Sequence, residues 1–268
     1  MNIVAIQRFR EMLARDETAY GMWVSFDAPS VTEIAVALGL DWVVFDAEHG
    51  HLDWGDIVHH LRAGVRSNTV LLVRIAETNA ALVKRALDLG ADGVVVPWVE
   101  TKEQLEQIVS FAHYPTRGIR GIGGERGTGW GQGIASHVEE AEANVLVIPI
   151  IESVKGGSNV EQLVKVDGVD VFYIGPADYS ATAGHAGQWE GPGVGEEIQA
   201  VAETIRDAGK HCGVVARDID DVHTRAGQGF RMIGFGHDGS LLIGALRERL
   251  SRVGREVTVH PSLNLPES

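Results

Sequence analysis

The stretch VLLVRIAETNAALVKRALDLGADGVVV, residues 70–96, contains a complete strand–helix–strand unit. Val70–Ile75 and Gly93–Val96 are short and apolar on both faces, which is typical of buried parallel strands. Between them, Asn79 can cap a helix over Ala80–Leu89. Two parallel strands joined by a helix form a right-handed crossover unit, so this stretch predicts an α/β protein.

Apolar runs of the same kind recur along the chain, with helical patterns between them. The other runs are Gly21–Phe26, Trp42–Asp46, Val145–Ile151, Val171–Ile174, Cys212–Val215 and Phe230–Gly234. The other helical patterns cover Val31–Leu38, Lys102–Ala112, Glu196–Ala208 and Leu241–Val253, and Ser30 and Thr101 can cap the first two. Eight such units in roughly 250 residues are typical of a (β/α)8 TIM barrel, although an open doubly wound sheet has the same alternation. No linker divides the chain, so we predict a single barrel domain over residues 1–268.

The composition limits the classes of partner. The chain has 268 residues, and 23 Lys and Arg against 37 Asp and Glu give a net charge of −14 at pH 7. Nucleic acids and anionic membranes bind basic surfaces, so neither is an expected partner. Cys212 is the only cysteine, which rules out an intrachain disulfide and a cysteine-rich metal site and fits a reducing compartment. Because no apolar run reaches about 18 residues and residues 1–15 lack a signal-peptide core, we expect a cytoplasmic protein.

Polar residues at the ends of the apolar runs are the candidates for function, because the active sites of (β/α)8 barrels lie at the C-terminal ends of the strands. The second run ends in Asp46-Ala47-Glu48-His49, the third in Arg74, the fifth in Glu152, the sixth in Gly175-Pro176-Ala177-Asp178 and the eighth in GFGHDG, residues 234–239. The five lysines lie in or beside helical patterns or precede a strand. None is therefore placed to form a Schiff base with a carbonyl substrate.

Glu152 and Asp178 follow consecutive strands and form a candidate metal site. Neighbouring strands lie about 5 Å apart, so both carboxylates can reach one ion. Two oxygen ligands plus water suit Mg²⁺, Mn²⁺ or a similar divalent cation. The alternative is structural, with Glu152 capping the next helix and Asp178 stabilising a turn.

His49 follows a strand end and is a candidate general base. It is equally a loop histidine that hydrogen-bonds a neighbour. The segment from Glu48 to His51 also contains His-x-His, a spacing that some barrel hydrolases use for zinc. Such sites need further ligands, and no strand from the third to the seventh ends in histidine.

Arg74 ends the third run and can hold an oxyanion or a carboxylate with two hydrogen bonds, or it can form a structural salt bridge. Asp88 lies four residues after Lys84 on a helix, where an exposed ion pair is the default interpretation. The irregular stretch from 113 to 135 is long enough to be a lid or a binding loop.

Several longer stretches resemble a known family. They are GLDWVVFDAEHG at 39–50, LLVRI at 71–75, NAALVKRALDLGADGVVVPWVET at 79–101, YPTRGIRGIG at 114–123, IIES at 150–153 and VDGVDVFYIGPADYSATAG at 166–184. In this order and spacing they resemble the HpcH/HpaI aldolases, which are metal-dependent class II pyruvate aldolases. The resemblance implies a barrel of the phosphoenolpyruvate/pyruvate type. It also implies a homo-oligomer, a hexamer or a trimer of dimers, whose subunits exchange a C-terminal helix.

The resemblance assigns catalytic roles to three residues. His49, in the motif Asp-x-Glu-His, would accept the proton, and Arg74 would stabilise the transition state. Asp88 matches an aspartate that raises the basicity of the histidine, a role that requires a contact across a subunit interface.

The resemblance also assigns the ligands. Glu152 and Asp178 would bind a divalent cation, Mg²⁺, Mn²⁺ or Co²⁺, and no organic cofactor is implied. The backbone of Gly175, Pro176 and Ala177 would contact the keto acid.

The implied reaction is reversible aldol cleavage and addition between pyruvate, or hydroxypyruvate, and an aldehyde through a metal-stabilised enolate. One departure concerns the substrate, because many members have Gln-x-Glu where this chain has Ile150-Ile151-Glu152. Two other functions are alternatives. A metal-dependent hydrolase would use Glu48, His49 and His51 around zinc, and a non-catalytic barrel would bind a keto acid without turnover.

Overall fold

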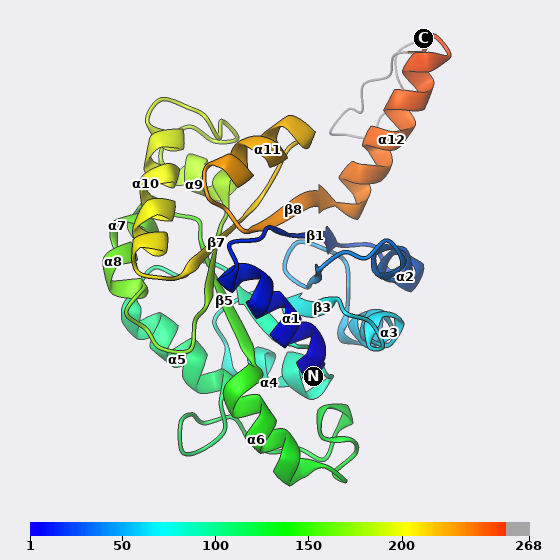
Figure 1. Cartoon of the computed structure of the whole chain (residues 1–268), viewed down its shortest axis with the longest axis vertical. Helices are drawn as coiled ribbons and strands as arrows, with labels where there is room; N and C mark the ends of the chain where they lie inside the picture. Colours follow the sequence, from blue (N-terminus) through cyan, green and yellow to red (C-terminus); the bar gives the residue numbers. More distant parts are fainter. Residues whose placement is uncertain (256–268) are drawn as a thin grey trace.

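The computed structural model describes residues 1–255, and in them eight parallel strands close into a barrel (Figure 1). The strands are β1 Ala19–Val24, β2 Trp42–Asp46, β3 Val70–Arg74, β4 Gly93–Val96, β5 Leu146–Ile151, β6 Val171–Ile174, β7 His211–Val215 and β8 Met232–His237. Each strand pairs with the next along the chain, and β8 pairs with β1. The predicted (β/α)8 barrel is confirmed, and the open sheet is excluded. Residues 256–268 of the predicted domain lie outside the described residues.

Helices connect the strands on the outside. They are α1 Ile3–Ala14, α2 Pro29–Ala37, α3 Trp54–Gly64, α4 Ala80–Asp88, α5 Lys102–Ala112, the 3₁₀ turn η1 Arg126–Thr128, α6 Ile134–Asn144, α7 Val154–Ser158, α8 Val160–Leu163, α9 Pro176–Thr182, α10 Val194–Asp207, α11 Ile219–Gly227 and α12 Asp238–Arg252. Asn79 and Thr101 cap α4 and α5 as predicted. Ser30 does not cap α2, because Pro29 already occupies the first turn and Ala28 is the capping residue. No helix in residues 1–255 is long and apolar enough to cross a membrane.

Two apolar layers hold the barrel together. One lies between strands and helices, and the other fills the barrel with strand side chains that point inward. Gly21 leaves the space that the Trp42 indole occupies, since a Cβ on Gly21 would lie 2.2 Å from Trp42 Cδ2. The inner layer continues into Ile6 and Phe9 of α1. Helix α1 therefore closes the N-terminal end of the barrel and leaves the site at the C-terminal end.

The connection from 113 to 135, predicted as a lid or a binding loop, lies at the closed end. It runs from α5 through η1 into α6, and α6 leads to β5. Connections from the helices back to the next strand lie at the N-terminal ends of barrel strands. Arg120 Nη2 donates to Asp88 Oδ1 at 2.8 Å, and Arg126 Nη1 donates to the carbonyl of Leu89 at 2.7 Å, both at the end of α4. Within one chain, the prediction that this stretch lines the substrate pocket does not hold.

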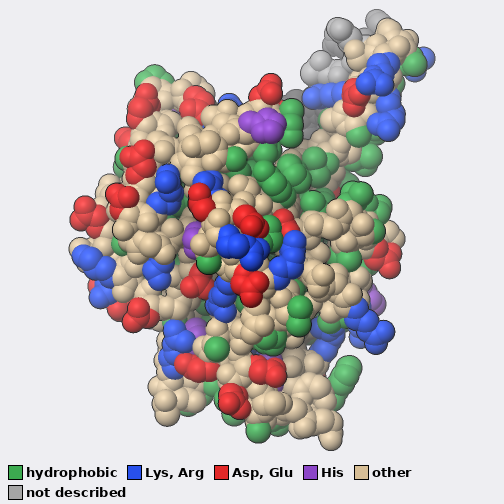
Figure 2. Space-filling model, viewed as in Figure 1, with side chains coloured by type: hydrophobic (Ala, Val, Ile, Leu, Met, Phe, Trp, Pro, Cys, Tyr) green, Lys and Arg blue, Asp and Glu red, His purple; other side chains and the backbone are tan. Residues whose placement is uncertain are grey.

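Helix α12 projects away from the barrel (Figure 1). Asp238 is the only residue of α12 that is buried, and its Oδ2 accepts hydrogen bonds from the backbone N–H groups of Ser25 and Phe26 at 3.0 and 2.9 Å. The large apolar residues along the helix are exposed, namely Leu241, Leu242, Ile243 and Leu246. A groove of about 850 Å³ runs between α12 and the surface of α2, β8 and α11. Figure 2 shows apolar side chains gathered where α12 leaves the body. We call this the α12 groove.

Candidate active site

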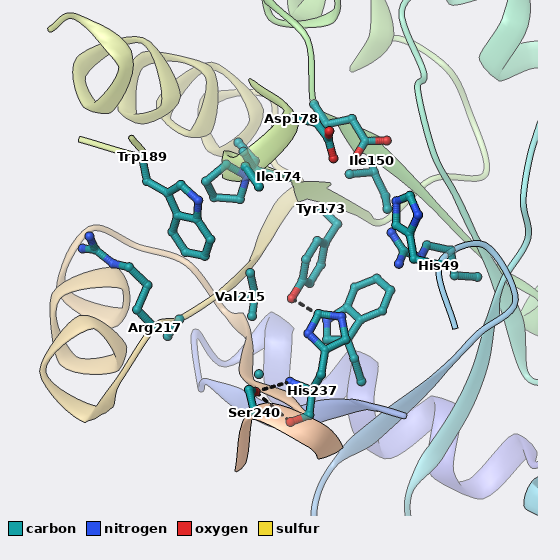
Figure 3. Close-up of a pocket in the computed structure, with 18 of the residues that line it drawn as sticks. His49, Ile150, Tyr173, Ile174, Asp178, Trp189, Val215, Arg217, His237 and Ser240 are labelled. Carbon is teal, nitrogen blue, oxygen red and sulfur yellow. Dashed lines mark hydrogen bonds between the residues drawn. The ribbon is translucent and has the colours of Figure 1, made fainter. Parts of the chain in front are cut away.

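A pocket of about 520 Å³ opens at the C-terminal ends of the strands (Figure 3). The predicted site residues that line it are His49, Arg74, Glu152, Gly175, Pro176, Ala177 and Asp178. They come from the ends of β2, β3, β5 and β6. The structure therefore brings together the predicted set with the exception of Asp88.

Arg74 is held by two carboxylates and an aromatic ring. Its Nε and Nη2 donate to the two carboxylate oxygens of Asp46 at 2.9 and 2.5 Å, and Nη1 lies 3.0 Å from Glu48 Oε2. Its guanidinium carbon lies 4.8 Å from the centre of the Trp23 ring. Burial works to raise the pKa of Asp46, but the hydrogen bond and the charge of Arg74 outweigh it and hold that pKa below its usual value. The salt bridge predicted as an alternative exists, and it fixes the cation within the pocket.

Glu152 lies among other carboxyl groups. It is only 4% exposed, and its Oε1 accepts a hydrogen bond from the backbone N–H of Trp98 at 2.7 Å. Burial raises the pKa of Glu152 to about 7, and the charges of Glu48 and Asp178 act in the same direction. Burial also raises the pKa of Glu48. Three negative charges in this region repel one another unless protons or a cation are bound.

This donor set fits a hard divalent cation. Carboxylate oxygens are the ligands that Mg²⁺ and Mn²⁺ prefer, and a cation would relieve the repulsion around Glu152. In residues 1–255 no group of three or more His, Cys, Asp or Glu side chains forms a metal-binding cluster. Two carboxylate ligands, from Glu152 and Asp178, would leave positions of such a cation open for water and substrate.

The turn after β6 brings a second carboxylate to Glu152. A Cβ on Gly175 would lie 2.8 Å from Glu152 Oε2, so a larger residue would displace that carboxylate. Pro176 begins α9, where its fixed φ suits the first helical position. Asp178 lies in the first turn of α9 and lines the pocket (Figure 3). Glu152 at the end of β5 and the turn after β6 thus lie together at the pocket.

His49 lies at the mouth of the pocket with its side chain 66% exposed, and its Nε2 is 3.8 Å from Glu48 Oε1. His51 turns elsewhere, because its Nε2 accepts from the backbone N–H of Asp27 at 3.4 Å and its ring lies 6.4 Å from that of Phe26. The His-x-His pair does not converge on one point of the pocket. The geometry therefore gives no support to the zinc hydrolase alternative.

Asp88 is the last residue of α4, at the closed end of the barrel. Its partner is Arg120 and not Lys84, the neighbour expected from helical spacing. The side chain of Arg120 is fully buried, and its guanidinium carbon lies 4.6 Å from the centre of the Tyr114 ring. Within one chain, Asp88 does not meet His49.

The rest of the pocket is mostly apolar, and apart from Ile150 and the run at 234–239 its residues were not predicted from the sequence. The apolar lining residues are Trp23, Ile150, Tyr173, Ile174, Trp189, Val215, Ala216 and Phe235. Figure 3 shows Trp189 and Val215 on the side away from His49. These residues are scattered over several strands and loops, so no local motif marks them. The only available signal was that Val215 ends β7, because Trp189 lies in the connection between α9 and α10.

Known proteins resemble this chain over most of its length. A sequence model of the family described as HpcH/HpaI aldolase/citrate lyase matches residues 19–245. The hydroxypyruvate/pyruvate aldolase of Delftia acidovorans is 35% identical over 246 residues, 91% of each chain. The 2-keto-3-deoxy-L-rhamnonate aldolase of Klebsiella pneumoniae is 34% identical over 94% of each chain. The crystal structure of an HpcH/HpaI aldolase/citrate lyase family protein from Burkholderia cenocepacia has a TM-score of 0.88 at 32% identity, covering 95% of this chain and 100% of that one.

Proposed function

The chain belongs to the HpcH/HpaI aldolase/citrate lyase family, and on this basis we propose that it is a class II pyruvate aldolase. It is a lyase that breaks and forms the carbon–carbon bond between pyruvate, or hydroxypyruvate, and an aldehyde. The observation that carries the proposal is the meeting of His49, Arg74, Glu152 and Asp178 in one pocket. The names of the aldolase relatives support it. Its partners are accordingly small molecules, a 2-oxo acid and an aldehyde.

Glu152 and Asp178 would hold the divalent cation, which is Mg²⁺, Mn²⁺ or Co²⁺ in this proposal. When bound, the cation supplies Lewis-acid polarisation of the 2-oxo acid. Gly175, Pro176 and Ala177 line the same pocket, and their backbone would contact the keto acid. Because Gly175 has no side chain, the Glu152 carboxylate keeps its position beside this turn.

Arg74 stabilises the negative charge that develops on the keto oxygen as the carbon–carbon bond breaks. It is already held by Asp46 and Glu48, so it needs no reorganisation as the charge forms. His49 moves the proton to or from the hydroxyl group of the aldol product. Its exposed side chain at the mouth of the pocket is free to reach that group.

Asp88 acts, in this proposal, at the active site of a neighbouring subunit. Its position at the closed end, held by Arg120, keeps it from the histidine of its own chain. The α12 groove and the exposed apolar side chains of α12 support an exchange of α12 between subunits. We propose a homo-oligomer built in this way, a hexamer arranged as a trimer of dimers.

An aldol assay tests the function. Pyruvate and hydroxypyruvate are offered with a panel of aldehydes, first with EDTA and then with Mg²⁺, Mn²⁺ or Co²⁺ restored. We expect activity to disappear with EDTA and to return with the cation. Glu152→Gln and Asp178→Asn should each abolish it, whereas a hydrolase built on Glu48, His49 and His51 would survive them. Activity that is insensitive to chelation would contradict the proposal.

A further inference from the structure

The pocket is larger than its keto acid requires. A three-carbon keto acid beside Glu152 and Asp178 fills a minor part of the roughly 520 Å³. The remaining space extends toward Trp189 and Val215 (Figure 3). The new bond joins the aldehyde to the carbon next to the keto group, so the aldehyde must occupy this space. We call it the acceptor space.

Most polar side chains around the acceptor space are already paired with one another, and the imidazole of His237 is the further polar group that lines the pocket. Trp23 Nε1 donates to Tyr173 Oη at 3.2 Å, and the two rings meet edge to face at 5.4 Å. Ser240 Oγ donates to the carbonyl of His237 at 2.8 Å and accepts from its N–H at 3.0 Å. Trp23, Tyr173 and Ser240 therefore present mainly carbon atoms, and substrate hydroxyl groups beside them would lose water without gaining partners from these side chains.

The guanidinium of Arg217, which lines the pocket beside the acceptor space, is also paired with carboxylates. Arg217 donates through Nε and Nη2 to the two carboxylate oxygens of Asp221 at 3.3 Å each, and Nη2 lies 3.7 Å from Glu190 Oε1. Asp221 and Glu190 do not line the pocket, but a carboxylate on the aldehyde would have to compete with them for the Arg217 guanidinium. Arg217 thus offers no unpaired positive charge to a carboxylated acceptor.

Trp189 forms a fixed wall of the acceptor space. Its ring centre lies 5.6 Å from the Arg217 guanidinium carbon. The next residue, Glu190, accepts from Nη2 of Arg225 at 2.5 Å, and Arg225 is only 2% exposed. The loop that carries the indole is therefore anchored to α11, and the wall exists before the substrate arrives.

We propose that the acceptor is a neutral aldehyde with an aromatic or branched aliphatic body, and that Trp189 selects it by packing against that body. This inference rests on the proposed function. In the addition, the enolate carbon attacks the aldehyde carbon. A carbon–carbon bond forms while the carbonyl π bond breaks, and the aldehyde oxygen takes one proton. The product is a 4-hydroxy-2-oxo acid with the apolar group on C4, and no further reactant is needed.

The experiment compares acceptors in the presence of pyruvate and Mg²⁺. Benzaldehyde and isobutyraldehyde represent apolar acceptors, glyceraldehyde a hydroxylated one and succinic semialdehyde a carboxylated one. We expect kcat/KM to be at least about tenfold higher for the apolar pair. Exchange of the pyruvate methyl protons with D₂O is followed in parallel, because it reports enolate formation without any acceptor.

The two proposals fail in different ways. Exchange together with a preference for glyceraldehyde or succinic semialdehyde would overturn the acceptor assignment and leave the aldolase in place. Absence of both exchange and aldol product would overturn the aldolase.

Variants of the wall make the test specific. Trp189→Ala should lower kcat/KM for benzaldehyde about tenfold relative to glyceraldehyde, and Trp189→Phe should restore most of the loss. Trp130→Ala removes an indole that is 71% exposed and does not line the pocket, and it should leave the ratio unchanged. An unchanged ratio in Trp189→Ala would remove Trp189 from this role.

Discussion

Arg74 is placed by carboxylates from the strand beside its own. Asp46 and Arg74 are paired in register between β2 and β3, so the two side chains meet at the same level of the barrel. Two hydrogen bonds to one carboxylate fix the plane of the guanidinium as well as its position. Asp46 is the first residue of the sequence motif Asp-x-Glu-His. Only the strand register explains why this position is an aspartate, because it places Asp46 beside Arg74.

Arg74→Ala should lower the kcat/KM of the aldol reaction roughly a hundred- to thousand-fold, because one charge-stabilising donor is lost. Binding of the divalent cation, measured by calorimetry, should persist since Glu152 and Asp178 remain. Arg66→Ala, at an exposed position, is the control. Unchanged turnover in Arg74→Ala would exclude the assigned role.

His137 on α6 should make the protein sensitive to acid. Burial, together with the charge of Arg120, lowers the pKa of His137 to about 4, whereas the unfolded chain titrates near 6.5. The folded state then binds fewer protons, so the stability from this residue is present above pH 6.5 and is lost as the pH falls toward 4. Between pH 7 and pH 5 the loss is about 2 kcal/mol.

Urea unfolding at both pH values tests this dependence. His137→Phe should reduce the difference in the free energy of unfolding between pH 7 and pH 5. His59→Phe, the same change at an exposed position of α3, should not reduce it. Equal pH dependence in the wild type and in His137→Phe would contradict the prediction.

The turn between β6 and α9 acts as one element with the end of β5. Backbone pairing continues into it, since the N–H of Gly175 donates to the carbonyl of Ile151 at 3.1 Å. The missing side chain of Gly175 then lets Glu152 occupy the space above the turn. This explains why a glycine stands at this strand end without any need for a positive φ, since its φ is −101°.

Gly175→Ala should weaken cation binding and lower kcat/KM, each by at least about tenfold, because the new methyl group displaces the Glu152 carboxylate. Calorimetry and the aldol assay measure the two effects. Gly55→Ala is the matched control, because its Cβ would meet nothing within 4 Å on α3. A fully active Gly175→Ala protein would show that this contact is unimportant.

Strand positions could be predicted from sequence because each buried strand is a short apolar run. The second to seventh runs match the strands to within one residue. By contrast, β1 begins two residues earlier than predicted, at Ala19, and β8 begins two residues later and ends three residues later, at Met232 and His237. The polar residues at the ends of these runs identified much of the pocket, because they too are recognised from a short stretch of sequence. The apolar wall at Trp189 and the pairing of Asp88 with Arg120 depend on contacts between distant segments, which no local pattern encodes. The placement of residues 113–135 could have been predicted, because a connection from helix to strand lies at the closed end.

At the scale of the whole molecule, α12 leaves the barrel incompletely covered. The α12 groove is lined largely by apolar residues, and the exposed residues of the helix are apolar as well, so the two surfaces match in polarity. Exposed apolar surface of this extent is unfavourable in an isolated chain.

Charges on α12 should therefore break the oligomer. Leu242→Asp combined with Leu246→Asp should yield smaller particles in light scattering coupled to size-exclusion chromatography, because a desolvated charge opposes docking. The control is Arg247→Asp combined with Ser251→Asp, which also introduces two aspartates into α12 but on the side away from these leucines. This variant should keep the wild-type mass. An unchanged mass in the leucine variant would contradict exchange of α12.

Subunit mixing tests the assignment of Asp88. If Asp88 serves a neighbouring site, Arg74→Ala and Asp88→Asn subunits are each inactive alone but should recover part of the activity when co-expressed, because some sites then combine two intact halves. Aldol turnover of the mixed preparation measures the recovery. Failure of any mixture to recover activity would place both residues at the same site or exclude Asp88.

In residues 1–255, α1 closes one end of the barrel and the pocket opens at the other. Arg74 and Glu152 are deeply buried, whereas Trp189 and His49 lie nearer the surface. An aldehyde packed against the Trp189 indole blocks access to Arg74 and Glu152. We therefore expect a compulsory order of binding, in which pyruvate binds first and is released last. Excess aldehyde should consequently trap the empty enzyme and slow it, and this inhibition should fade as pyruvate is increased.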